Sequence, residues 1–191
     1  MARKLSPEKR TNILRAALDL FVTNGIQNTS TAEIARAAGI AAGTLFLYFP
    51  TKQALIDELA IELSKDQAAR INALLDPSLS ARDTFFAIWS GTVAWFLENM
   101  DAYQYVQLVR DTGSISEHAV QETGQMFAYY YAAIQKGHAE GSIKPYPTDL
   151  IGGGLFYDLV AIVATLRMQP EVNPDETIRQ GFEIFWNGIK K

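Results

Sequence analysis

Two hydroxyl side chains and one ammonium group are spaced so that they could contact a nucleic acid. Thr44 and Tyr48 are four residues apart, which places them one turn apart on the same face of a helix. Lys52 follows Pro50, where its ammonium group could reach a phosphate. Hydroxyl groups bind both base edges and phosphates, so the chemistry indicated here is hydrogen bonding to a nucleic acid.

The residues that enzymes use most often do not form a recognisable site. The sequence has no cysteine, and its two histidines, His118 and His138, lie 20 residues apart in one expected helix, with no cluster at metal-ligand spacing. No glycine-rich phosphate loop and no ordered set of serine, histidine and aspartate is present. We therefore predict that the protein is not an enzyme and that it binds no metal and no cofactor.

The elements that must position Thr44 and Tyr48 are two short helices joined by a tight turn. Ser30 lies three residues before Glu33, the spacing of a reciprocal N-cap, and Gly39 stands where the first helix has to stop. A second helix over residues 41–49 ends at Pro50. This pattern is the sequence form of a helix-turn-helix unit.

The second helix of a helix-turn-helix unit lies in the major groove of DNA. Small residues at positions 41–43 remove bulk at its start, so that the backbone could come close to phosphates. Leu45 and Phe49 would point inward. The residues expected to form the DNA-binding site are Ser30, Thr31, Ala41, Ala42, Gly43, Thr44, Leu47, Tyr48 and Lys52.

The string GTLFLYFPTKQALI, residues 43–56, resembles the end of the DNA-binding domain of TetR/AcrR-type repressors. Ile34, Ala35, Gly39 and Ile40 match the same pattern, and the match covers roughly residues 8–56. The resemblance implies a repressor that binds an operator as a dimer, pairs through its last two long helices and responds to a small molecule.

The sequence departs from the family pattern in the helix expected to read DNA. Relatives commonly carry polar or basic residues where Ala41 and Ala42 stand, and often a polar or aromatic residue at Leu47. Fewer hydrogen bonds to base edges are then available, and Leu47 or an alanine would contact a thymine methyl group instead. We expect the protein to recognise its operator through Thr44, Tyr48 and apolar contacts.

The charge of the chain is distributed unevenly. Residues 1–52 carry seven Lys and Arg residues against three acidic ones, a net charge of +4, whereas the remainder carries −8 and the whole chain −4. A basic end on an acidic body suits a polyanion-binding part attached to a part that does not bind DNA. Lys4, Lys9 and Arg10, near the start of the first helix, are further candidates to meet phosphates, although each could equally belong to a solvated surface.

The fold class expected from these patterns is all-α, because no stretch shows the alternation of a strand. We expect an N-terminal three-helix helix-turn-helix domain over residues 1–52. A helical ligand-binding and dimerisation domain over residues 53–191 would follow it. About nine helices are predicted, over residues 7–24, 30–38, 41–49, 51–75, 80–99, 101–112, 116–140, 148–168 and 177–189.

The body is rich in aromatic residues that could line a pocket between helices. The candidates for binding a small-molecule effector are Phe86, Trp89, Tyr103, Phe127, Tyr130, Tyr131 and Asp158. An aromatic stripe on a helix more often belongs to the core, so each of these residues could also be structural. The expected effector is apolar or aromatic.

The stretch 150–166 is almost entirely apolar and could be read as a membrane span. It is only 17 residues long and contains Asp158 near its middle, so we predict a helix buried on two sides and no membrane association. With the last helix it would form a four-helix interface with a second chain. The residues expected at this interface are Gly154, Ile178, Phe182, Phe185 and Ile189.

The resulting hypothesis is a ligand-responsive transcriptional repressor. Its expected partners are a near-palindromic double-stranded DNA operator, a small-molecule effector and a second copy of the chain. The absence of cysteine and of a secretory signal fits a cytoplasmic protein. The alternative is a helical adaptor, or an enzyme, that uses the same scaffold without binding an operator.

Overall fold

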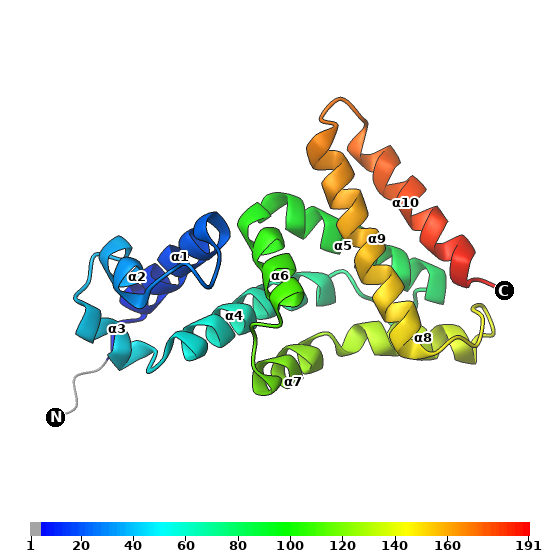
Figure 1. Cartoon of the computed structure of the whole chain (residues 1–191). Coiled ribbons are helices and arrows are strands. Elements are labelled where there is room, and N and C mark those ends of the chain that lie inside the picture. The colour runs from blue at the N-terminus through cyan, green and yellow to red at the C-terminus, as the bar shows by residue number, and fades with distance from the viewer. Residues whose placement is uncertain (1–4) are drawn as a thin grey trace. The chain divides into compact units, whose positions relative to one another are not determined.

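A computed structural model of the chain describes residues 5–191 and is helical through most of that range (Figure 1). The helices are α1 Pro7–Asn24, α2 Thr31–Ala37, α3 Ala42–Tyr48, α4 Lys52–Asn72, α5 Ala81–Glu98, α6 Met100–Thr112, α7 Glu117–Met126, α8 Ala128–Ala139, α9 Thr148–Met168 and α10 Pro174–Ile189. The prediction of an all-α fold is confirmed. The chain packs into a first unit, residues 5–64 and 99–123, and a second unit, residues 65–98 and 124–191.

The helix ends follow the capping signals in the sequence. Ser6 caps α1 by accepting the N–H of Lys9 at 3.4 Å, and α1 ends at Gly25, whose positive φ of 83° suits glycine. The last helix begins at residue 174, three residues earlier than predicted. Asn173 caps it by accepting the N–H of Glu176 at 3.1 Å, and a proline occupies the first helical position.

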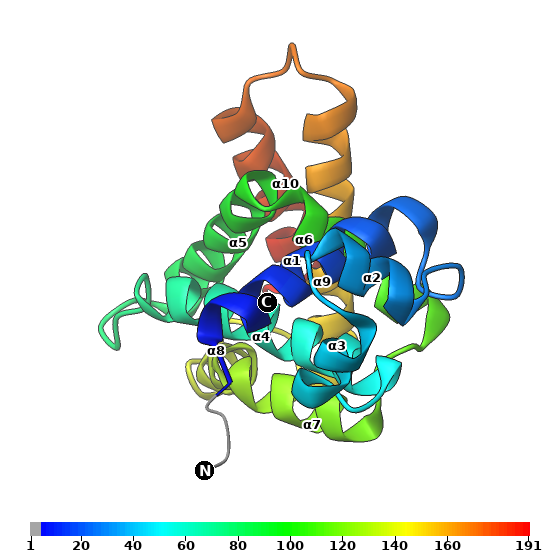
Figure 2. The same ribbon diagram turned by 90° about the vertical axis from the view of Figure 1, so that its left-hand side faces the viewer.

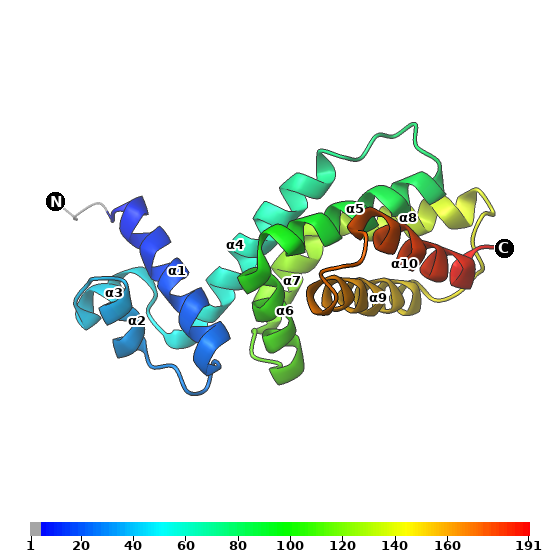
Figure 3. The same cartoon turned by 90° about the horizontal axis from the view of Figure 1, so that it is seen from above.

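The first unit is built around one hydrophobic core that α1, α2, α3, the start of α4 and α6 share. Figures 2 and 3 show α1, α2 and α3 grouped at the N-terminal end of the chain. Tyr105 of α6 is fully buried in this core and stacks on Phe21, with ring centroids 6.2 Å apart. Its hydroxyl donates to the carbonyl of Ile56 at 2.8 Å. The first unit therefore extends past the predicted boundary at residue 52, because α6 completes its core.

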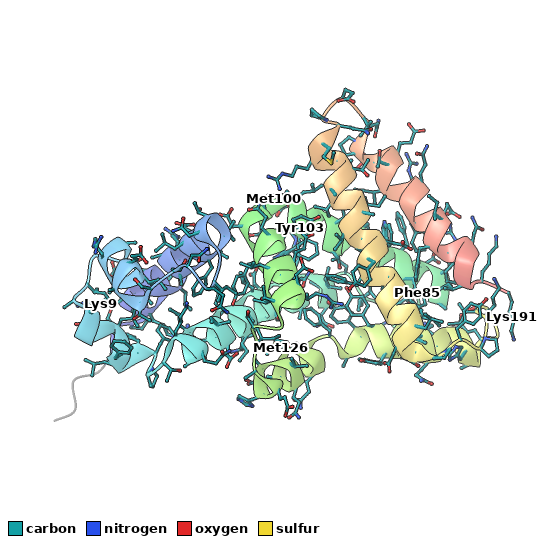
Figure 4. The ribbon with its side chains drawn as sticks, viewed as in Figure 1. Lys9, Phe85, Met100, Tyr103, Met126 and Lys191 are labelled. Carbon is teal, nitrogen blue, oxygen red and sulfur yellow. The ribbon has the colours of Figure 1, made fainter. Side chains whose placement is uncertain are left out.

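The second unit is organised around α5, which packs against α8, α9 and α10. Trp89 is fully buried there, stacks on Phe185 at 5.9 Å and donates from its indole N–H to the carbonyl of Ile178 at 2.9 Å. Phe85, labelled in Figure 4, packs against Phe185 and Trp186. The aromatic residues of α5 and α10 thus fill the core of this unit.

The long helix predicted over residues 116–140 is divided into α7 and α8, and this break gives ten helices in the described range instead of nine. Phe127 lies between the two helices with φ −96° and ψ 21°, outside helical geometry. The rings of Phe127, Tyr129 and Tyr130 lie 4.8–6.1 Å apart in centroid distance. These rings pack at the break, and helical periodicity alone does not reveal such a break.

Candidate nucleic-acid interface

The helix-turn-helix unit is fixed by a capping box at its start and a glycine in its turn. The Ser30 hydroxyl donates to the Glu33 carboxylate at 2.7 Å and accepts the Glu33 N–H at 3.2 Å, while the Ser30 N–H donates to the same carboxylate at 2.8 Å. These hydrogen bonds hold the pKa of Glu33 below its ordinary value. Gly39 closes α2 with φ 69°, a left-handed conformation that leads the chain into α3.

The N-terminal and outer surface of α3 is exposed as the sequence indicated. The three small residues at 41–43 are exposed, and Leu47 is the most exposed large side chain of this helix at 68%. Leu45 and Phe49 are buried in the core of the first unit. Thr44 is half-buried at the edge of this surface. Phe46, which was not among the predicted site residues, is 44% exposed and lies on the same helix.

Tyr48 is not the outermost side chain of α3, contrary to the sequence-based expectation. It is half-buried, and its hydroxyl oxygen accepts the backbone N–H of Ser6 at 2.9 Å. The start of α1 and the end of α3 are therefore joined by a hydrogen bond. Spacing within residues 41–49 could not predict this contact, because the donor lies 42 positions away in the sequence.

Two basic residues proposed as phosphate ligands make contacts within the first unit. The Lys52 ammonium group donates to the carbonyl of Ile26 at 2.5 Å and is half-buried. Arg10 pairs with Glu58 and, at 3.4 Å, with Glu62, so it joins α1 to α4. Lys9, a further predicted phosphate ligand, is exposed and lies one helical turn after Ser6, which contacts Tyr48. Lys4 lies outside the described residues.

The predicted effector-binding residues do not gather in one place. Trp89 is part of the α5–α10 core, and Tyr103 is buried in the first unit, whereas Tyr131 is 52% exposed. Phe86 lines a surface groove of about 600 Å³ between α4, α5 and α10, beside Arg70 and Arg179. Phe127 and Tyr130 pack against each other, with ring centroids 6.1 Å apart.

A buried polar cluster lies where α5 and α8 pack together. The Tyr130 and Thr92 hydroxyls are 3.4 Å apart. Tyr129, which sequence reasoning did not select, is 8% exposed; its hydroxyl lies beside that of Tyr130, but within residues 5–191 it makes no hydrogen bond of acceptable geometry. Burial raises the pKa of Tyr129 and Tyr130, and it also raises the pKa of Asp158 on α9.

Among the described residues no group of three His, Asp or Glu side chains could hold a metal ion.

Three residues assigned to a dimer interface belong to the chain's own core. Phe182, Phe185 and Ile189 are 1%, 4% and 7% exposed, so their side chains are not available to a partner. Phe182 and Phe185 pack against aromatic residues of α5, and amphipathic spacing alone could not indicate that α5, and not a second chain, covers them. Ile178 is half-buried and Gly154 is exposed.

The exposed apolar surface of α9 and α10 lies on the opposite side from that core. Figures 1 and 2 show the two helices side by side. On α9 the uncharged exposed residues recur at steps of four, three, four and seven: Leu150, Gly154, Tyr157, Ala161 and Met168. Ile184 of α10 is 72% exposed. By length and composition α9 could cross a membrane, and only 22% of its most apolar window is buried within the chain.

Comparison with known proteins identifies similar sequences and structures. Residues 13–59 match the family model described as bacterial regulatory proteins, tetR family. The HTH-type transcriptional regulator YhgD of Bacillus subtilis is 25% identical over 191 residues, which cover 95% of this chain and 96% of that protein. The HTH-type transcriptional regulator AcrR of Shigella flexneri is 42% identical over 62 residues, which cover 31% of this chain and 29% of AcrR. A solved structure from Shewanella sp. PV-4, assigned to the tetR family of transcription regulators, superposes with a TM-score of 0.89 at 27% identity. The superposition covers 96% of this chain and 98% of the Shewanella chain.

Proposed function

The chain belongs to the TetR family of bacterial regulatory proteins, and on this premise we propose that it represses transcription in the cytoplasm by binding an operator as a homodimer. The family and the relatives are transcriptional regulators, not enzymes. The observation that carries the proposal is the exposed, sterically open start of α3, which is positioned by the capping box and the Gly39 turn. In a helix-turn-helix protein this end of the second helix meets the base edges.

The DNA contacts that we propose combine hydrogen bonds with apolar contacts. Thr44 donates or accepts a hydrogen bond at a base edge, and Leu47 with the alanines at 41 and 42 packs against thymine methyl groups. Ser30 and Thr31 lie at the start of α2, where they approach the phosphate backbone. Lys52 keeps two ammonium protons beyond the one it gives to the Ile26 carbonyl, so it can still donate to a phosphate.

Gly43 offers the sharpest test of contact between α3 and DNA. Glycine weakens a helix relative to alanine, and a Cβ built at this position meets no heavy atom within 4 Å, so nothing in the free chain requires glycine here. We expect Gly43→Ala to stabilise the free protein by up to about 1 kcal/mol. The added methyl group should nevertheless separate the α3 backbone from DNA and weaken operator binding about tenfold, or about 1.4 kcal/mol.

The measurement uses a duplex that the wild-type protein selects from a random-sequence pool. Dissociation constants and thermal unfolding midpoints are compared for the wild type, Gly43→Ala and the matched control Gly124→Ala. Gly124 lies in α7, and a Cβ there also meets no heavy atom within 4 Å. The control should gain stability without losing DNA affinity. If Gly43→Ala binds DNA as tightly as the control, α3 does not approach DNA through its start.

We propose that a second chain covers the exposed seam of α9. The most apolar window of α9 has a mean hydropathy of 1.6, and only 22% of that window is buried in one chain, so its exposed apolar residues form a surface of the kind that a partner covers. The steps of four and three residues between Leu150, Gly154 and Tyr157 are those of a helix that packs against a partner helix. Two copies related by a two-fold axis would present two α3 helices to half-sites about 34–36 Å apart, so the operator should be a near-palindrome.

We propose that the effector binds at the cluster of Phe127, Tyr129 and Tyr130. Trp89 and Tyr103, which the sequence analysis named as effector-binding residues, are not part of this proposed site. A buried hydroxyl without a partner costs about 1–3 kcal/mol, and a ligand that supplies the missing hydrogen bond removes this cost. The effector is therefore aromatic or apolar and carries at least one polar group. Binding to a form of the dimer with a different α3 separation lowers operator affinity by linkage.

A further inference from the structure

The hydrogen bond between the start of α1 and the end of α3 has a consequence for DNA binding. The backbone N–H of Ser6 donates to the Tyr48 hydroxyl oxygen at 2.9 Å. A phenolic hydroxyl carries one donor and also accepts. The Ser6 contact uses only the accepting side. Within residues 5–191 the O–H proton of Tyr48 has no acceptor, although the side chain is half-buried.

The location of Tyr48 favours a phosphate as the acceptor. It is the last residue of α3, whereas the N-terminal residues of such a helix are the ones that contact base edges. The neighbouring surface contains exposed Lys9 from the first turn of α1. A hydrogen bond donated to the phenolic oxygen also polarises its O–H group and makes it a better donor to an anion.

We propose that the Ser6 backbone N–H is a positioning group that orients the Tyr48 hydroxyl to donate to one phosphate in each operator half-site. This inference rests on the proposed function, because it requires that α3 binds DNA. It assigns the N-terminus of α1 a part in DNA binding that does not depend on the charge of its side chains. The first turn of α1 and the last turn of α3 then act as one phosphate-binding element.

Substituting Ser6 by proline and by alanine distinguishes the contribution of its backbone N–H from that of its side-chain hydroxyl. Ser6 has φ −78° and ψ 123°, which a proline can adopt and which a residue before Pro7 also favours. Ser6→Pro therefore removes the N–H and the capping hydroxyl, whereas Ser6→Ala removes only the hydroxyl. The difference between the two variants reports the N–H, whereas Tyr48→Phe removes the Ser6 contact and the proposed phosphate contact together.

The experiment measures dissociation constants for the duplex that the wild-type protein selects from a random-sequence pool. We expect Ser6→Pro to bind about tenfold more weakly than Ser6→Ala, as loss of a neutral hydrogen bond in each half-site requires. Tyr48→Phe should lose at least as much affinity, because it also removes the hydrogen bond to the phosphate, and Ser6→Pro should add nothing in the Tyr48→Phe background. The salt dependence should stay unchanged, because a neutral donor releases no counterions.

A merely structural role is distinguished by replacing single phosphates of the duplex with methylphosphonates. For the wild type, one position in each half-site should be sensitive, and this sensitivity should be lost in both Tyr48→Phe and Ser6→Pro. If Ser6→Pro does not fold, the same scan with Tyr48→Phe decides the phosphate contact. Equal affinities of Ser6→Pro and Ser6→Ala, or a scan in which Tyr48→Phe keeps every sensitive position, would overturn the inference alone. If the wild type selects no duplex, the proposed function fails with it.

Discussion

Replacing Tyr105 with alanine is expected to lower the free energy of unfolding of the first unit by about 3–5 kcal/mol, as for other large buried aromatic residues. Tyr105 is completely buried, stacks on Phe21 and donates to the carbonyl of Ile56. Alanine would leave a cavity between α1, α4 and α6 and remove the hydrogen bond. A loss of this size is a large fraction of the stability of a typical domain.

The matched control is Tyr105→Phe, which keeps the ring and removes only the hydroxyl. Its cost should be about 1 kcal/mol, the net value of one hydrogen bond. Chemical denaturation of both variants provides the comparison. If Tyr105→Ala costs no more than Tyr105→Phe, then α6 does not complete the core of the first unit. In that case α1, α2 and α3 would form a stable core without α6.

Replacing Ile184 with aspartate is expected to convert the protein into folded monomers and to weaken operator binding by about 10²-fold or more, because the second half-site contact is then no longer intramolecular. Ile184 is 72% exposed in the single chain, so a charge there should not disturb the fold. In the proposed dimer the substitution would bring a charge from each chain into an apolar interface.

Sedimentation equilibrium and operator titration are the measurements, with Ile184→Leu as the control that keeps an apolar side chain. The control should remain dimeric and bind DNA like the wild type. Circular dichroism establishes that the aspartate variant is folded. A dimeric Ile184→Asp protein with full operator affinity would place the interface elsewhere on the chain.

Local signals in the sequence were sufficient to predict most helices and the helix-turn-helix unit. The Ser30–Glu33 capping box and the Gly39 turn depend on residues within a few positions of each other, so their spacing specifies their geometry. The same holds for the inward positions Leu45 and Phe49, which periodicity identifies.

Contacts between distant segments could not be predicted in this way. The partners of Lys52 and Arg10, a carbonyl and two carboxylates, lie 26 to 52 positions away along the chain. The role of Tyr105 in the first unit depends on a similar long-range contact. The last helix is apolar on one face, and this pattern does not state whether α5 or a second chain covers Phe182 and Phe185.

The effector residues were the least predictable because nearly every aromatic residue of the body satisfied the same criterion. Burial then separated them: Trp89 packs in a core, Tyr131 is exposed, and Tyr129 carries a buried hydroxyl without a partner in the described range. The environment of the Tyr129 hydroxyl could not be inferred from a continuous helix over residues 116–140, because α8 begins only after Phe127. The aromatic pattern of this stretch did not indicate where the helix is interrupted.

If α3 reads the bases of an operator, a substitution on its exposed surface should change the sequence preference of the protein. The wild type and Leu47→Arg each select duplexes from one random-sequence pool, and the enriched sequences are compared. Arginine binds guanine bidentately, whereas leucine can only contact a methyl group. We predict that both proteins enrich inverted repeats and that Leu47→Arg shifts one symmetric position in each half-site from thymine to guanine. Identical enriched sequences for the two proteins, or no enrichment by the wild type, would contradict the account.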